Sequence, residues 1–152
     1  MDDLDRRILD ALQYDFPLSE RPYEVLAERL GLDADVLWHR VEHMVEQGVI
    51  RRLGASIDSR KLGYCGTLAA VRVTPDLVER AAEVIGRYPE VTHSYLRDHE
   101  FNIWFTIIAR DDRRIENVLD EIRGELLLDP SSVLNLPMMR MFKLDARFNV
   151  RP

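Results

Sequence analysis

The sequence lacks several features that would assign it to a class at once. It has one cysteine, Cys65, in 152 residues, which excludes an intramolecular disulfide. No signal peptide and no apolar run of membrane-spanning length is visible. Basic residues are fewer than acidic ones, 21 against 27, and a net charge of −6 disfavours non-specific binding to polyanions. The four histidines match no compact zinc set. We therefore expect a cytoplasmic protein without a resident metal and without a membrane partner.

The first part of the chain has the pattern of three short helices. Asp2 or Asp3 can cap the first, the second begins after Pro22 and stops at Gly31, and Asp33 caps a third that ends at Gly48. Two helices joined by a short turn after a preceding helix are typical of a helix-turn-helix. An extended segment follows at residues 49–57. The pattern predicts a winged helix-turn-helix domain over residues 1–60.

The charges of this domain disagree with DNA binding. Residues 1–60 contain 13 acidic and 8 basic side chains, which accounts for −5 of the net charge of −6. The third helix has four acidic residues and Arg40 as its one firm cation. A helix in the major groove lies beside two rows of phosphates, so this balance is repulsive. We expect no functional DNA binding. His39 and His43, at i and i+4, have a metal-ligand spacing, but no third ligand is apparent, and exposed polar side chains on a helix explain them.

The rest of the chain, residues 61–152, predicts a second, α+β domain. Its elements follow in the order βαββαβ, with a strand at 67–73, a helix opened by Pro75, two strands within 91–106, a helix at about 113–126 and a last strand containing Met139, Met141 and Phe142. This order is typical of a ferredoxin-like fold with helices on one face of an antiparallel sheet. The other face is rich in large side chains, so we expect a partner chain to cover it.

Reactive side chains are concentrated in residues 91–106, where two strands meet at a tight corner. Alternate residues of a strand share a face. A hairpin would therefore gather a patch from His93, Tyr95 and Arg97 of the first strand and Asn102 and Trp104 of the second, with His99 at the corner.

A winged helix-turn-helix followed by a βαββαβ domain resembles the Lrp/AsnC family of feast-famine regulators over almost the whole chain. Residues 4–9, 26–32 and 48–51 lie where that family has its helix signatures. The hairpin corner departs from it. The regulators typically have a Gly-x-x-Asp effector motif there, whereas this sequence has His99-Glu100-Phe101-Asn102.

The departures are similar to another branch of the same fold, the siroheme decarboxylases of the alternative heme pathway and the related heme d1 biosynthesis proteins. The resemblance is carried by separated blocks at residues 50–55, 61–64, 91–106 and 136–143. The hairpin block looks most like the alpha subunit of the heterodimeric enzyme. That implies a paralogous beta subunit as partner, or otherwise a homodimer.

This resemblance implies a carboxy-lyase that removes the C12 and C18 acetate carboxyl groups of siroheme, giving 12,18-didecarboxysiroheme and carbon dioxide. The conjugated macrocycle can accept the electrons left by carbon dioxide, so no separate cofactor is required. The protein must supply a proton, and His93 and His99 suit this task because imidazole titrates near neutral pH. Either could instead ligate the siroheme iron, and the sequence leaves both roles open for both residues.

Binding roles follow from the same resemblance. Tyr95 and Trp104 can stack on a tetrapyrrole or belong to the sheet core, and we expect core packing for Trp104, whereas Tyr95 could also donate a hydrogen bond. Asn102 can orient a neighbour or the substrate. A solvated surface charge is the alternative for any single cation. The candidate partners for the substrate carboxylates are Arg51, Arg52, Arg97, Arg140 and Lys143.

Two other functions remain open at this stage. The first is a transcriptional regulator of the Lrp/AsnC type, against which the acidic third helix and the altered corner count. The second is a catalytically silent module that senses heme or stabilises a partner. Conversion of siroheme by the protein would separate the enzyme from both.

Overall fold

The computed structural model describes residues 1–150 and divides the chain into two compact units. The helical unit contains Met1–Ala55 together with Lys143–Pro152, and the sheet unit contains Ser56–Phe142. The sequence placed one boundary at residue 60 and assigned everything after it to the second domain. The structure differs at the C-terminus, because the segment that begins at Lys143 groups with the helical unit.

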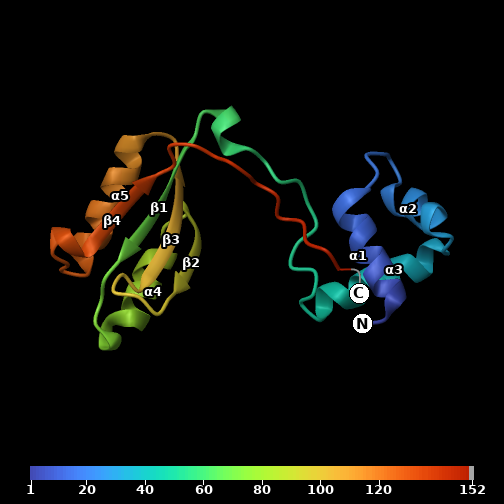
Figure 1. Ribbon diagram of the computed structural model, residues 1–152, viewed down its shortest axis with the longest axis horizontal. Coiled ribbons are helices and arrows are strands. Elements are labelled where there is room, and N and C mark those ends of the chain that lie inside the picture. The colour runs from blue at the N-terminus through green and yellow to red at the C-terminus, as the bar shows by residue number, and fades with distance from the viewer. Residues whose placement is uncertain (151–152) are drawn as a thin grey trace. The chain divides into compact units, whose positions relative to one another are not determined.

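The helical unit is built from α1 (Asp3–Tyr14), α2 (Pro22–Leu30) and α3 (Ala34–Glu46), as Figure 1 shows. The expected helix ends are confirmed. Asp2 caps α1, with its Oδ1 accepting from the Asp5 N–H at 2.9 Å and its own N–H donating to the Asp5 carboxylate at 2.8 Å. Gly31 ends α2 with a φ of 68°, and Asp33 caps α3.

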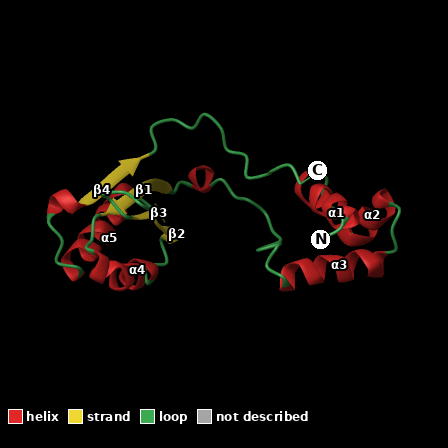
Figure 2. Cartoon of the chain, turned by 60° about the horizontal axis from the view of Figure 1, so that its bottom comes forward, coloured by secondary structure: helices red, strands yellow, loops and turns green. Residues whose placement is uncertain are grey.

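The predicted wing does not form as β structure. Residues 49–58 contain no strand, and Figure 2 draws the chain after α3 as a loop up to the short 3-10 helix η1 (Ser59–Leu62). The expectation of an extended segment did not include a second strand to pair with it. A single extended segment has no ladder partner, and its first turn is held instead by the Ile50 N–H, which donates to the Met44 carbonyl at 3.0 Å.

The sheet unit has the predicted βαββαβ order. Its strands are arranged β2-β3-β1-β4, and each neighbouring pair is antiparallel. The elements are β1 (Cys65–Val71), α4 (Val78–Gly86), β2 (Val91–Leu96), β3 (Ile103–Ala109), α5 (Asp112–Glu125) and β4 (Val133–Pro137). This arrangement confirms the ferredoxin-like fold.

The core of the sheet unit lies between one face of the sheet and the two helices α4 and α5 (Figure 1). Ile103, Phe105 and Ile107 of β3 point into it, and none is more than 2% exposed. Val84 of α4 and Ile122 of α5 meet them there. In residues 56–142, no helix covers the opposite sheet face. We refer to it below as the open face.

The prediction of the last strand was wrong. β4 is Val133–Pro137, and it pairs with β1 so that Val133 lies opposite Val71. Met139 and Phe142, which were expected in the strand, lie in irregular chain and are 99% and 84% exposed. Pro137 explains the end of the strand, because a proline has no N–H to continue the ladder.

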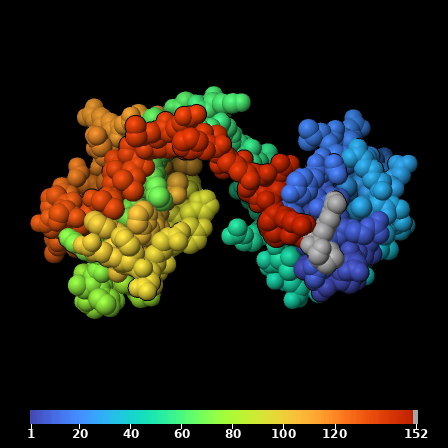
Figure 3. Space-filling view, in the orientation of Figure 1, coloured from blue at the N-terminus to red at the C-terminus, as the bar shows by residue number. Residues whose placement is uncertain are grey.

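The C-terminal segment after Phe142 returns to the helical unit. In Figure 3 its red spheres lie against the blue N-terminal helices. Gln13 of α1 makes two hydrogen bonds to the backbone of Phe148, at 3.2 and 3.1 Å, and the Arg147 guanidinium lies 4.6 Å from the ring centre of Tyr14. Val150 is only 9% exposed in the core of the helical unit. These contacts explain why the C-terminal segment belongs to the first unit.

Candidate functional site

A β-bulge sets the direction of the candidate residues on β2. Val91 lies opposite Ile107 of β3 and packs on the core, whereas His93 lies opposite Thr106 on the open face. Strict alternation would put both odd-numbered residues on one face. The register shifts between them, so Thr92 is the extra residue of the bulge. Bulges of this kind often redirect a side chain beside a functional site.

His93, Tyr95 and Arg97 form a row along the open face, as expected from their spacing. The rings of His93 and Tyr95 are stacked, with centroids 6.3 Å apart and planes 17° apart. The Arg97 guanidinium lies 6.0 Å from the centre of the Tyr95 ring. Tyr95 is 51% exposed. The row therefore presents an imidazole, an aromatic ring and a cation to any ligand on this face.

The hairpin corner holds His99 beside Phe101 and Trp104. The Phe101 N–H donates to Nδ1 of His99 at 3.1 Å, and the Trp104 indole N–H donates to the Phe101 carbonyl at 2.7 Å. The rings of His99 and Trp104 meet edge to face with centroids 6.1 Å apart. Trp104 lies opposite Tyr95 on the open face, so the expectation that it packs in the sheet core was wrong, because Ile103 and Phe105 on either side of it fill the core face.

Asn102 has a structural partner. Its amide oxygen accepts from the Val73 N–H at 3.1 Å, and its amide nitrogen donates to the Val73 carbonyl at 2.9 Å. Its own N–H donates to the Val71 carbonyl. Of the two roles expected from the sequence, these bonds favour orientation of a neighbour, because they join the start of β3 to the chain that leaves β1.

The two histidines differ in the nitrogen that remains free. Nδ1 of His93 lies 2.9 Å from Oγ1 of Thr92, whose hydroxyl donates to the Thr106 carbonyl at 3.4 Å. The Thr92 oxygen therefore accepts from a proton on His93 Nδ1, which leaves a lone pair on Nε2. At His99 the Phe101 N–H occupies Nδ1, so the proton is on Nε2. This network assigns a free acceptor nitrogen to His93 and a free N–H donor to His99.

The remaining cations are not part of the hairpin cluster. Arg140 belongs to the sheet unit, where its guanidinium lies 4.7 Å from the centre of the Phe142 ring. Arg51, Arg52 and Lys143 belong to the helical unit. Of the two candidate carboxylate-binding cations in the sheet unit, Arg97 contacts a hairpin side chain, the ring of Tyr95.

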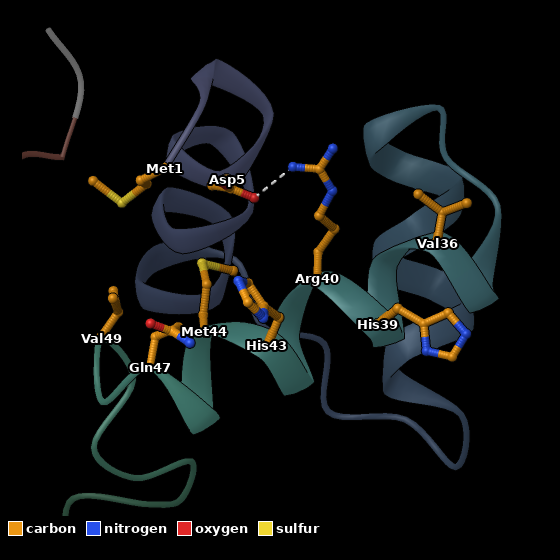
Figure 4. Close-up of a pocket in the computed structure, with 9 residues that line it drawn as sticks. All are labelled: Met1, Asp5, Val36, His39, Arg40, His43, Met44, Gln47 and Val49. Carbon is orange, nitrogen blue, oxygen red and sulfur yellow. Dashed lines mark hydrogen bonds and ion pairs between the residues drawn. The ribbon is translucent and has the colours of Figure 1, made fainter.

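The helical unit has a cavity of its own, of about 590 Å³, that contains none of the hairpin residues. It is lined mainly by α3 and shown in Figure 4, where the imidazoles of His39 and His43 diverge and Arg40 is turned toward Asp5. Among residues 1–150 no group of three or more His, Cys, Asp or Glu side chains could hold a metal ion. The hairpin brings imidazole, aromatic and guanidinium groups together on one face, so we place the candidate site there and not in this cavity.

Sequence reasoning missed two members of the cluster. Thr92 acts through a bulge, and alternation alone assigns it to the opposite face. Phe101 acts through its peptide group, which any residue type would supply. For Thr92 the available signal was its position directly before a histidine in a strand that opens with Val91.

In the part of the chain that the structure describes, every helix is too short or too polar to span a membrane.

Two family models match the sequence. The AsnC-like ligand binding domain matches residues 61–143, and the siroheme decarboxylase NirDL-like HTH domain matches residues 5–51. Together they cover both structural units.

Curated proteins match over nearly the whole chain. A siroheme decarboxylase alpha subunit of Desulfovibrio desulfuricans is 41% identical over 150 residues, which are 99% of this chain and 85% of that protein. A siroheme decarboxylase NirD subunit of Pseudomonas aeruginosa is 36% identical, over 97% of this chain and 96% of that protein. The crystal structure of siroheme decarboxylase NirDL in complex with an iron-uroporphyrin III analogue is 30% identical and has a TM-score of 0.70, over 97% of this chain and 48% of that chain. With this identity along almost its full length, the chain belongs to the siroheme decarboxylase family.

Proposed function

We propose that this chain is a subunit of a siroheme decarboxylase that removes the C12 and C18 acetate carboxyl groups of siroheme in the cytoplasm, as a step of heme biosynthesis. The observation that carries the proposal is the histidine-bearing hairpin of the sheet unit, in a chain 41% identical to a siroheme decarboxylase alpha subunit. The product would be 12,18-didecarboxysiroheme, with two molecules of carbon dioxide.

The reaction needs one proton for each acetate. When the bond to the carboxyl carbon breaks, carbon dioxide leaves without the bonding electron pair, which passes into the conjugated macrocycle. A proton then converts the remaining CH2 carbon into a methyl group. Electrons balance without an oxidant or reductant, so the protein supplies binding, positive charge and a proton.

His93 is the proton carrier in this proposal. Its Nδ1–H is held by Thr92, so the free Nε2 can take up a proton from solvent and pass it to the substrate carbon. The ring returns each time to the tautomer that the Thr92 bond favours. Ligation of the siroheme iron by the same lone pair is the competing use of Nε2, and the experiment below separates the two.

His99 has a different role because its Nδ1 is already an acceptor. Its Nε2–H can donate a hydrogen bond to a substrate carboxylate. Arg97 adds positive charge beside Tyr95, whose exposed ring offers a surface for the macrocycle. Arg51, Arg52, Arg140 and Lys143 remain candidates for the other carboxylates, and Trp104 and Asn102 support the corner.

A paralogous chain is the proposed partner, and the open face is its proposed contact. The names of the similar proteins, alpha and NirD subunits, describe enzymes with more than one kind of subunit. Leu68 of β1 and Leu136 of β4 lie opposite each other on the open face and are 44% and 46% exposed, and Thr106 of β3 lies between Leu68 and His93. A partner that buried these leucines would also close the site against water.

The test is anaerobic decarboxylation of siroheme by the purified chain together with its partner subunit. Product mass and absorbance are followed for the wild type, His93→Ala and His99→Ala, with His43→Ala as a matched control on α3. We expect His93→Ala to lower the rate by roughly 100-fold or more with little change in siroheme affinity. His99→Ala should weaken binding and rate together.

Three results would contradict parts of this proposal. Unchanged siroheme with the wild-type pair refutes the enzymatic function. A rate loss in His43→Ala equal to that in His93→Ala refutes the hairpin as the site. A loss of siroheme affinity and a changed iron spectrum in His93→Ala would assign Nε2 to the iron and not to proton transfer.

A further inference from the structure

Arg72, which directly follows β1, attaches the hairpin corner to the end of that strand. Its guanidinium makes an ion pair with Glu100 and lies 5.7 Å from the centre of the Phe101 ring. It also donates to the Ser132 hydroxyl at 3.3 Å, and its backbone N–H donates to the Ser132 carbonyl at 2.9 Å. Arg72 therefore connects the corner to the segment that leads into β4.

The residues that Arg72 contacts are the neighbours of the His99 hydrogen bond. Phe101 supplies the N–H that donates to Nδ1 of His99, and Glu100 lies between these two residues in sequence. The Phe101 carbonyl is fixed from the other side by the Trp104 indole. The N–H and the carbonyl of Phe101 belong to successive peptide groups, so a change in the backbone angles of Phe101 would disturb these two bonds, and the contacts of Arg72 oppose that change.

We infer that Arg72 is a positioning residue for His99. Through Glu100 and the Phe101 ring it holds the corner so that the Phe101 N–H occupies Nδ1 and the Nε2–H points outward as a donor. Arg72 touches neither imidazole and has no part in proton transfer. The significance for catalysis depends on the proposed function, whereas the effect on His99 geometry does not.

The corner without Arg72 has fewer restraints. His99 and Phe101 are both near the tip of a tight turn, in which the His99 N–H donates to the Arg97 carbonyl at 3.0 Å. Ion pairs between exposed side chains are individually weak, but the Arg72 guanidinium combines an ion pair, a ring contact and a hydroxyl contact in one rigid group. Lysine cannot reproduce this combination.

The test measures the His99 hydrogen bond directly in the full chain without siroheme. Nuclear magnetic resonance detects the 15N–15N coupling that passes through the hydrogen bond between the Phe101 nitrogen and Nδ1 of His99. We expect this coupling in the wild type and its loss in Arg72→Gln and Glu100→Ala. Arg123→Gln is the matched control, because Arg123 forms an exposed ion pair with Asp120 on α5, outside the corner. It should retain the coupling.

Each outcome decides the inference. Persistence of the coupling in Arg72→Gln and Glu100→Ala overturns it, as does its absence from the wild type. If Arg72→Gln loses the chemical-shift dispersion of a folded protein, the inference is decided by the coupling in Glu100→Ala. Glu100 is exposed, and its truncation leaves Arg72 bound to Ser132. In the decarboxylation assay, Arg72→Gln should lower the rate roughly tenfold. If the wild-type pair leaves siroheme unchanged but the coupling depends on Arg72, the proposed function fails and the positioning role stands.

Discussion

Replacement of Thr92 by valine tests the role of the β-bulge with the smallest change in shape. Valine keeps the branched volume of threonine and removes the hydroxyl that lies 2.9 Å from Nδ1 of His93. The imidazole then loses the partner that holds its proton on Nδ1. Some neutral His93 side chains would carry the proton on Nε2 instead, and these rings would accept the next proton at Nδ1 and not at Nε2.

The size of the effect follows from the exposure of the bond. Thr92 and His93 are both exposed, so the hydrogen bond contributes near the lower part of the usual range, about 0.5–1 kcal/mol. That free energy corresponds to a shift of roughly two- to fivefold in the ratio of the two neutral tautomers, and we expect a decrease of at most that size in the rate of decarboxylation if His93 carries the proton. Siroheme affinity should stay within about twofold, because neither group is a proposed carboxylate partner.

The assay is single-turnover decarboxylation with the partner subunit, beside a siroheme titration. Thr67→Val is the control, because it removes a hydroxyl from the same sheet whose bond goes to Asn135 and not to His93. The reasoning is refuted if Thr92→Val keeps the wild-type rate while His93→Ala abolishes it. It is also refuted if Thr67→Val slows the reaction as much as Thr92→Val.

Four further outcomes are expected. The Arg40 guanidinium, bonded to Asp2, and the Asp5 N–H hold the pKa of the Asp2 carboxyl at about 2 instead of 3.8, so the helical unit should lose stability as pH falls from about 3.8 to about 2. Arg40→Ala should reduce this dependence in circular-dichroism melts, because the bond from the Asp5 N–H remains. Phe105→Ala should destabilise the sheet unit by about 3–5 kcal/mol in urea titrations, because Phe105 is 1% exposed. Gln13→Ala should destabilise the helical unit by about 0.5–1 kcal/mol and speed proteolysis of the segment around Phe148, because both bonds that it loses are exposed. Gel shifts at low salt should show no DNA binding, and a retarded band that disappears with added salt would contradict this.

The sign of the pH effect on Asp2 follows from the direction of its pKa. The folded state binds the proton less tightly than the unfolded state, so the stabilisation is fully present above pH 3.8 and disappears as the carboxyl is protonated near pH 2. Arg40→Ala should therefore be less stable than the wild type at neutral pH and equal to it in strong acid. A constant difference across this range would exclude the ion pair as the cause.

Local chemistry determined the elements that the sequence predicted well. Asp2 and Asp33 cap helices because a carboxylate accepts from the free N–H groups of the first turn, and Gly31 ends α2 because it adopts a positive φ without strain. The βαββαβ order also follows from local periodicity. Within the hairpin, alternation correctly put His93 and Tyr95 on one face, since that rule needs only the strand itself.

The features that the sequence did not predict depend on contacts between distant segments. β4 lies at Val133–Pro137 because these residues pair with β1, whereas the methionine-rich stretch after it was an equally apolar choice. The position of the C-terminal segment depends on Gln13, more than a hundred residues away. The tautomers of His93 and His99 depend on a bulge and on one peptide group, neither of which has a residue signature.

The helical unit has the three helices of a helix-turn-helix but lacks the basic charge that DNA binding needs. Arg40, the one firm cation of α3, bonds to Asp2 at 2.6 Å and to Asp5 at 2.9 Å, the same two residues that form the cap of α1. A phosphate could recruit this guanidinium only by competing with two carboxylates of its own chain. The ion pairs that join α3 to α1 therefore also neutralise the side chain that DNA binding would need. Arg40 can either form the ion pairs that join α3 to α1 or bind a DNA phosphate. The acidic residues around it favour the ion pairs.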